Sequence, residues 1–376
     1  QGSGRAGGDG VMAKLGEVCL LKAGKFVSAN DISPEYNKGL YPCFGGNGIR
    51  GYVADYTHDG EFPLIGRQGA LCGNVNLASG KFHATEHAVV VQPKIEMNVH
   101  WLYYALNAMN LGQYATGAAQ PGLAVSKLET LSIEIPNISE QNKIAQTLYK
   151  VEQLVNFRKQ QLAKLDELVK ARFVEMFGTF PANPFRWSIG KIQDVVSDVR
   201  YGSSRPAVEG GKYPYLRMNN ITYSGELDLR DTKRIDIPDS ELDKCTVRRG
   251  DVLFNRTNSK ELVGKTCVYN RDELMVLAGF VIRVRINERI RPEVLSAFLN
   301  MDFSKRMLIG MCKTAIGQAN INAKELQNID LYIPPIELQD QFVTLKNKID
   351  QQKQTVQQSL GKLELLKKAL MQEYFG

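Results

Sequence analysis

An internal repeat is the feature that most constrains how this chain can fold. Residues 120–178 align without a gap with residues 318–376, which lie 198 positions later in the chain. Matched pairs run along the whole alignment: Leu128/Leu326, Ile135/Ile333, Gln141/Gln339, Lys170/Lys368, Glu175/Glu373 and Phe177/Phe375. Two copies of one long unit predict a pseudo-twofold molecule, and they suggest a target or set of partners that is itself roughly two-sided.

The region that precedes each copy is related more loosely. Three correspondences, given with their offsets, are residues 14–18 with 188–192 (174), Tyr41-Pro42 with Tyr213-Pro214 (172) and Arg67 with Arg256 (189). Because the offset then grows to 198 at Gln120, the second region carries extra loop residues. Both regions contain short apolar runs separated by turn residues, which predicts mixed strands with helices over 98–109 and 291–309.

Both repeat copies then turn helical. Apolar residues recur at heptad spacing after Pro136 and after Pro334-Pro335, and Arg158 and Arg172 fill two positions of the first seam. The apolar seam residues are Ile144, Leu148, Val151, Val155, Leu162, Leu165, Val169 and Met176, and then Phe342, Leu345, Ile349, Val356, Leu360, Leu363, Leu366 and Leu370. We expect the two helices to pair as an antiparallel coiled coil. Two independent amphipathic helices, each lying on its own domain, are the alternative.

The length of 376 residues favours two domains over a single core. The patterns predict an α+β protein in which two globular mixed α/β domains alternate with two long helices. The expected segments are a disordered tag (1–11), the first domain (12–138), the first helix (139–178), the second domain (179–336) and the second helix (337–376).

The net charge of +7 permits a nucleic-acid partner without establishing one. The six cysteines form no C-x-x-C pair, which favours reduced thiols in a cytoplasm-like compartment. No apolar run approaches the length of a membrane span, and the first ten residues lack the apolar core of a signal peptide.

This alternation of domains and repeated helices resembles the specificity subunits of type I DNA restriction-modification systems, from Met12 to the C-terminus. Local stretches resemble the family's target recognition domains: 248–256 with 264–268, and Gly66-Arg67 with 85–89. The run that begins at Gln120 and again at Gln318 and ends in Ile-Pro resembles the family's join into the conserved helix.

The resemblance implies a non-catalytic subunit without a cofactor of its own, in the cytoplasm of a prokaryote and without a membrane partner. Each recognition domain would read one half of a bipartite, asymmetric double-stranded DNA site. The helices would act as a spacer and dock two methyltransferase subunits, which bind S-adenosylmethionine and methylate adenine at N6. Restriction subunits would add cleavage that depends on ATP and Mg. A helix over 139–177, about 57 Å long, would limit the separation of the half-site centres to about 17 base pairs.

Candidate DNA-contacting residues follow from base chemistry, since Arg most often reads guanine and Asn or Gln reads adenine. In the first domain they are Tyr41, Asn47, Arg50, Arg67, Gln68 and Gln120. In the second domain they are Arg200, Tyr201, Ser203, Ser204, Arg205, Arg217, Asn219, Asn220, Arg256 and Asn258. Lys265, Lys313 and Asn320 are candidates for contacts with the DNA backbone.

Other functions remain as alternatives. A zinc hydrolase would use His83, Glu86 and His87, which fit H-x-x-E-H, although the flanking residues predict a turn and a strand where that chemistry needs a helix. Phe44-Gly-Gly-Asn-Gly fits a methyltransferase loop but lacks the following helix, and Gly264-Lys265-Thr266 lacks the first P-loop glycine. A coiled-coil scaffold without a DNA role is the remaining alternative.

Overall fold

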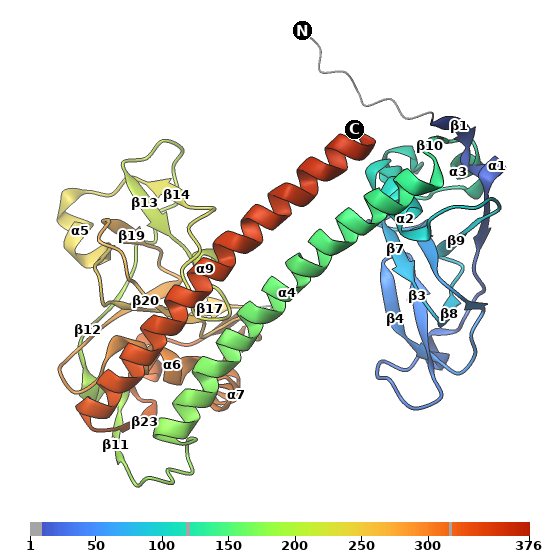
Figure 1. Ribbon diagram of the computed structural model, residues 1–376. Helices are drawn as coiled ribbons and strands as arrows, with labels where there is room; N and C mark the ends of the chain where they lie inside the picture. The colour runs from blue at the N-terminus through green and yellow to red at the C-terminus, as the bar shows by residue number, and fades with distance from the viewer. Residues whose placement is uncertain (1–9, 118–120, 316–317) are drawn as a thin grey trace. The chain divides into compact units, whose positions relative to one another are not determined.

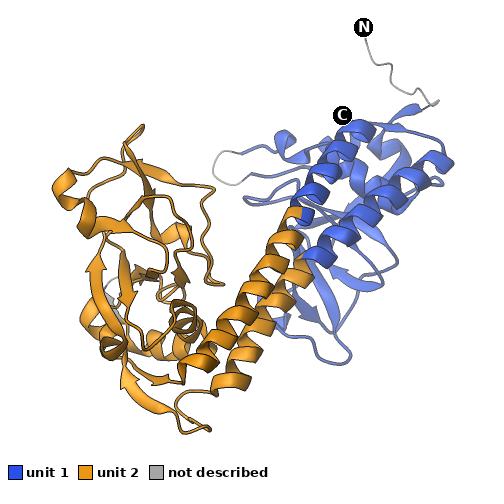
Figure 2. Ribbon diagram, turned by 60° about the vertical axis from the view of Figure 1, so that its left-hand side comes forward, with its two compact units in different colours: residues 1–158, 359–376 blue, residues 159–358 orange. Residues whose placement is uncertain are grey.

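The computed structural model describes residues 10–117, 121–315 and 318–376. The chain divides into two compact units, one made of residues 1–158 and 359–376 and the other of residues 159–358 (Figure 2). Each unit contains one globular domain and parts of both long helices. Domain 1 denotes the globular part before the first long helix, and domain 2 the globular part between the two long helices.

Domain 1 is built on two four-stranded sheets. The first has the strand order β2 (Cys19–Ala23), β9 (Ala88–Pro93), β6 (Phe62–Gly66) and β7 (Val75–Ala78). The second has the order β4 (Gly48–Val53), β3 (Tyr41–Gly45), β8 (Lys81–Ala84) and β5 (His58–Asp59). The remaining elements are the pair β1 (Val11–Lys14) and β10 (Ser132–Ile135), the helices α1 (Leu15–Val18), α2 (Val99–Ala108) and α3 (Val125–Glu129), and the 3-10 turns η1 (Ala29–Asp31) and η2 (Leu111–Tyr114).

Domain 2 repeats both sheets in the same order. The first consists of β12 (Val196–Tyr201), β20 (Val281–Ile286), β16 (Val252–Asn255) and β18 (Thr266–Val268). The second consists of β14 (Lys233–Ile235), β13 (Tyr213–Leu216), β19 (Met275–Leu277) and β15 (Thr246–Val247). The remaining elements are β11 (Ser188–Lys191) with β23 (Asp330–Ile333), the small sheet β17 (Thr257–Asn258), β22 (Gln318–Asn320) and β21 (Lys313–Ala315), the helices α5 (Asp239–Cys245), α6 (Pro292–Asn300), α7 (Asp302–Met311) and α8 (Ala323–Gln327), and the turns η3 (Ile192–Val195) and η4 (Met218–Asn220).

The equivalence of the two domains extends to single backbone contacts. Gly24 and Gly202 both follow the first strand of their sheet, and a Cβ atom on either would lie 2.1 Å from a carbonyl oxygen, that of Ala84 or of Leu277. No other residue type fits such an approach. Strand β3 pairs with β8 in the parallel sense, and β13 pairs with β19 in the same way, which confirms the correspondence of Tyr41-Pro42 with Tyr213-Pro214.

One predicted correspondence is wrong by three residues. Leu15 N–H donates to Leu131 O (2.8 Å), and Ile192 N–H donates to Ile329 O (2.9 Å), so Leu15 is equivalent to Ile192. Residues 14–18 therefore correspond to 191–195, at an offset of 177, and not to 188–192. A short mixed polar and apolar string matches at more than one register, whereas the pairing of β1 with β10 and of β11 with β23 allows only one.

The two long helices are α4 (Ile138–Phe177) and α9 (Ile336–Phe375), and each begins one residue earlier than expected. A repeated glutamine anchors each start. Gln141 Nε2 donates to Pro136 O (2.8 Å) and its Oε1 accepts from Asn98 N–H (2.9 Å), just before α2. Gln339 makes the equivalent bonds with Pro334 O (2.8 Å) and Arg291 N–H (2.8 Å), just before α6. Both glutamines are buried, which explains their retention in the repeat.

The helices pair in opposite directions, as predicted (Figure 1). Lys367 of α9 donates to Glu152 of α4 in the first unit (2.8 Å), and Lys353 donates to Asp166 in the second. Both pairs of numbers sum to 519 (367 + 152 and 353 + 166), so the two units share one antiparallel register. The alternative of independent helices is therefore wrong, and the expected fold class of two α/β domains alternating with two paired helices is confirmed.

The seam differs from the prediction at its ends. Phe173 and Phe177 of α4 are buried and contact the ring of Phe342 of α9, with centroids 5.6 and 5.4 Å apart. In contrast, Leu366 was expected in the seam but is 46% exposed. The helix predicted over 98–109 is α2, whereas the one predicted over 291–309 is interrupted at Met301, whose extended backbone separates α6 from α7. None of the described helices is long and apolar enough to cross a membrane.

Candidate nucleic-acid interface

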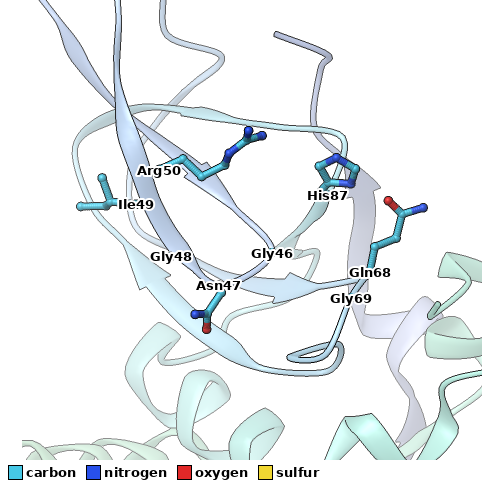
Figure 3. Close-up of a pocket in the computed structure, with 8 residues that line it drawn as sticks. All are labelled: Gly46, Asn47, Gly48, Ile49, Arg50, Gln68, Gly69 and His87. Atoms are coloured by element: carbon cyan, nitrogen blue, oxygen red, sulfur yellow. The ribbon is translucent and has the colours of Figure 1, made fainter. Parts of the chain in front are cut away.

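A hollow of about 520 Å³ opens on domain 1 (Figure 3). It is lined by residues 46–50 from the β3–β4 hairpin, by Gln68 and Gly69 after β6, and by His87 before β9. Gly66 allows this arrangement, because a Cβ atom there would lie 2.0 Å from Gly46 O. Three segments that are distant in sequence thus present polar side chains around one opening.

The hairpin turn is positioned by neighbouring side chains and by its own irregularity. Asn74 Nδ2 donates to Asn47 Oδ1 (2.9 Å), which ties the turn to the start of β7. Phe44 pairs with Ile49 while Cys43 pairs with Gly51, so Arg50 is the extra residue of a β-bulge. A β-bulge changes the direction of nearby side chains, so this bulge sets the direction of the exposed Arg50 guanidinium.

The structure brings three of the six predicted residues of domain 1 to this hollow. Asn47, Arg50 and Gln68 line it, whereas Arg67, which precedes Gln68, is not one of the lining residues. Tyr41 lies at the opposite end of β3, where its ring contacts Tyr56 edge to face at 5.0 Å. Gln120 lies outside the described residues.

Domain 2 gathers a second cluster at the corresponding sheet edge. The Arg256 guanidinium lies over the ring of Tyr201, 4.8 Å from its centroid, and Tyr201 Oη accepts from Ala323 N–H (2.8 Å). Thr257 Oγ1 donates to Asn320 Oδ1 (3.2 Å) across the pair β17–β22. Asn258, half-buried beside them, accepts from Ser259 N–H (2.9 Å). Only the backbone of Lys313 is described, in β21.

Three predicted arginines of domain 2 are held by carboxylates on the surface. Arg200 pairs with Asp198 (2.9 Å), Arg205 with Glu241 (2.7 Å) and Arg217 with Asp231 (3.0 Å). The Arg205 guanidinium lowers the pKa of the Glu241 carboxyl. Exposed pairs of this kind are weak, about 1 kcal/mol or less, so a phosphate can compete for the arginine. Ser204 and Asn219 are exposed near them.

Three further predictions do not fit the positions that the structure gives. Ser203 is buried and its Oγ accepts from Arg205 N–H (3.2 Å). Asn220 is buried, donates to Asp228 O (2.8 Å) and accepts from Arg217 N–H (2.9 Å). These side chains are used by the loop itself, so they have no surface with which to contact DNA in this conformation.

Lys265 is the third predicted DNA-contacting residue whose position in the structure does not fit that role. Its ammonium is buried and donates to Met218 O (3.0 Å), and burial lowers its pKa. Lys265 is equivalent to Asn74, because Lys265 O accepts from Asn255 N–H as Asn74 O accepts from Gly66 N–H. Both side chains therefore support the segment that follows β13 or β3. The sequence prediction of a contact with the DNA backbone overlooked this structural role.

The sequence motifs that suggested enzymatic functions adopt other local structures than those functions need. His83 lies on β8 with both ring nitrogens 3.3 Å from carbonyl oxygens, those of Asp55 and Lys25. His87 lies in a turn and pairs with Glu86 (3.2 Å). Across residues 10–117, 121–315 and 318–376, no three His, Cys, Asp or Glu side chains gather as metal ligands do. The Phe44-Gly-Gly-Asn-Gly loop is a strand hairpin, and Gly264-Lys265-Thr266 leads into a strand.

Sequence reasoning placed His87 in a metal motif and in the stretch 85–89 that resembles a target recognition domain, but did not name it as a DNA-contacting residue, yet His87 lines the hollow. Asn74 was not singled out at all. Their roles depend on backbone contacts between distant segments. For Asn74 the sequence offers one sign, a polar residue directly after a glycine, as in Gly73-Asn74 and Gly264-Lys265.

Comparisons with known proteins find relatives in both sequence and fold. The family described as "Type I restriction modification DNA specificity domain" matches residues 9–167. The specificity subunit of the Escherichia coli type I restriction enzyme EcoprrI is 52% identical over 149 residues, which are 39% of this chain and 37% of that protein. The specificity subunit of EcoKI from E. coli K12 is 22% identical over 260 residues, 65% of this chain and 56% of that protein. This chain spans less than two thirds of the length of either relative.

Solved structures share the fold at low identity. The S subunit of a type I restriction-modification system from M. genitalium superimposes with a TM-score of 0.63 at 17% identity, over 99% of this chain and 97% of that chain. A chain from a structure of a type I restriction-modification system gives a TM-score of 0.54 at 17% identity, over 100% of this chain and 99% of that chain.

Proposed function

Because this chain belongs to the family of type I restriction-modification specificity subunits, we propose that it is the non-catalytic subunit that selects the DNA target of such a complex. One observation carries the proposal. The two domains share a backbone framework down to single hydrogen bonds, while the side chains at the sheet edges differ. This is what two readers of different sequences on one double helix require, since a common framework docks on the phosphates and variable side chains read bases.

In this proposal each domain reads one half of a bipartite, asymmetric site. Tyr41 is left out because it lies at the other end of β3 from the hairpin. The residues that contact DNA are the other accessible members of the predicted set, namely Asn47, Arg50, Arg67, Gln68, Tyr201, Ser204, Asn219, Arg256, Asn258 and Asn320, and the arginines Arg200, Arg205 and Arg217 after exchange of a carboxylate for a phosphate. The paired helices α4 and α9 set the number of unread base pairs between the half-sites.

The same helices dock two methyltransferase subunits. Leu168 of α4 and Leu366 of α9 are equivalent in the repeat (168 + 198 = 366), and they are 39% and 46% exposed. Exposed leucines at equivalent places are suited to two copies of one partner. Those partners bind S-adenosylmethionine and methylate adenine, and restriction subunits that use ATP and Mg join the complex.

The test is methylation mapping of cells that express this chain with its methyltransferase subunits. We expect methylated adenines in one bipartite motif, and none when this chain is omitted. The purified complex should bind that motif with an affinity that falls steeply with salt. Binding without any sequence preference would favour the coiled-coil scaffold, and methyl transfer by this chain alone would also overturn the proposal.

The docking step has its own test. Leu168→Asp and Leu366→Asp should each lower the number of bound methyltransferase subunits from two to one, and the double variant should bind none, as measured by mass photometry of the assembled complex. Lys164→Asp on the charged surface of α4 is the control and should keep both copies. Full assembly of the double variant would exclude these leucines from the docking surface.

A further inference from the structure

Four backbone hydrogen bonds are repeated around Arg67 and Arg256. Arg67 N–H donates to His87 O (3.0 Å) and Arg67 O accepts from Leu123 N–H (2.9 Å); Arg256 N–H donates to Phe280 O (3.0 Å) and Arg256 O accepts from Ile321 N–H (3.0 Å). One residue earlier, Gly66 and Asn255 each exchange two backbone hydrogen bonds with the segment that begins at Gly73 or Gly264. The two arginines thus occupy equivalent positions in the backbone framework that the domains share, which confirms their predicted correspondence.

The residues around the two arginines are not retained. Gln68 is replaced by Thr257, His87 by Phe280 and Asn74 by Lys265, when positions are matched through the same hydrogen bonds and strand pairs. Two domains that read different DNA sequences are expected to differ in their base-reading side chains. A side chain that both domains retain while its neighbours differ is therefore expected to contact a feature that both half-sites share. The sugar-phosphate backbone is the feature that two DNA half-sites share whatever their sequences are.

Both guanidinium groups are available for an anion. In the part of the chain that the structure describes, neither forms an ion pair, unlike those of Arg200, Arg205 and Arg217. Both side chains are half-buried, and that of Arg256 is fixed over the ring of Tyr201. Arg256 Nε is buried without a partner among the described residues, so it is a polar group that a ligand could satisfy. A cation held in place loses little side-chain freedom when it binds a phosphate.

Arg50 is in the opposite situation. It lies in the bulge of the β3–β4 hairpin, and the described residues of domain 2 contain no such hairpin. There, β13 is followed by residues 217–232 before β14 pairs with it, with η4 and an irregular segment in between. Arg50 therefore has no counterpart in the second domain, and its contact is particular to the first half-site.

We propose that Arg67 and Arg256 are the equivalent phosphate anchors of the two domains, which position each domain on the DNA backbone without reading sequence, and that base reading in the first half-site falls to Arg50 on the hairpin. This inference rests on the proposed function and divides the predicted readers into two chemical classes. It differs from the sequence-based expectation that both arginines read bases.

The experiment uses the complex of the full chain with its methyltransferase subunits. Dissociation constants are measured over a range of salt concentrations for the mapped site and for single base-pair changes in each half-site. Arg67→Gln should weaken binding about tenfold on all these DNAs alike and reduce the salt slope by about one. Arg256→Gln should do the same, and the double variant should reduce the slope by about two. Arg50→Gln should instead relax the preference at a base pair of the first half-site.

Two controls make the result specific. Arg249 lies at the other end of β16 from Arg256 and pairs with Asp272 (2.7 Å), so Arg249→Gln should leave both slope and preference unchanged. Arg67→Lys keeps a charge without the guanidinium fork and should retain most of the slope, which reports that the site is folded. A variant of Arg67 or Arg256 that relaxes the preference at one base pair while the salt slope stays constant would overturn the inference alone. A wild-type complex without sequence preference would overturn the proposed function as well.

Discussion

At the scale of single residues, Lys305 on α7 is an internal charge without a carboxylate partner among the described residues. Its side chain is 8% exposed, and its Nζ donates to Gly264 O (2.6 Å). Burial, with smaller effects of Lys170 and Lys265, lowers the pKa of Lys305 to about 7. The group is therefore neutral in the folded state over much of the range in which it is charged in the unfolded chain.

This gives a pH dependence with a defined sign. Between pH 7 and the ordinary lysine value the unfolded state binds the extra proton, so stability rises with pH across that window and is lowest at its acid end. From pH 7 to pH 9 Lys305 should add on the order of 2 kcal/mol to the free energy of unfolding. Lys305→Met should remove this rise, as measured by urea unfolding at both pH values. An unchanged rise in the variant would show that Lys305 is charged in the fold.

At the scale of elements, Lys353 links three segments of the second unit. It lies on α9, is 12% exposed, and pairs with Asp166 of α4 and with Glu226 in the segment between η4 and β14. The segment that replaces the hairpin of domain 1 is thus attached to the helix pair of its own unit. Removal of one member of a buried charge cluster leaves the others uncompensated.

Lys353→Gln should therefore lower the free energy of unfolding by about 2 kcal/mol, less than for a fully buried pair because both carboxylates are partly exposed. It should also weaken binding to the second half-site more than to the first. The matched control is Lys164→Gln on α4, whose pair with Glu167 is exposed and should not affect unfolding measurably. Equal unfolding midpoints for the two variants would exclude a structural link through Lys353.

At this scale, some features of the fold and of the candidate site could be predicted from the sequence and others could not. The heptad spacing and the gapless repeat predicted α4, α9 and their antiparallel pairing, because a long seam has few ways to be buried. Arg67 and Arg256 could be matched because each stands beside a strand of similar composition. Lys265, Asn220 and Ser203 were misassigned, because their partners are carbonyls and amides set by tertiary structure. Lys265, for example, bonds to Met218, which is 47 residues away in sequence.

At the scale of the whole molecule, the two halves of the α4–α9 pair share one register, which allows a specific test of the spacer hypothesis. Deletion of one heptad from each helix, at positions that sum to 519, such as 158–164 with 355–361, keeps the seam and the register. Seven residues correspond to about 10 Å, or about 3 base pairs. Methylation mapping should therefore show both half-sites unchanged in sequence and the gap shortened by no more than that amount.

The control deletes four residues from each helix, which breaks the heptad phase and should abolish assembly instead of moving the half-sites. The comparison separates two roles that the helices can have. If they only hold the methyltransferase subunits, a heptad deletion that still assembles leaves the gap as it was. If they also measure DNA, the gap shortens while the bases in each half stay the same, since the recognition edges of domains 1 and 2 lie outside the deleted segments.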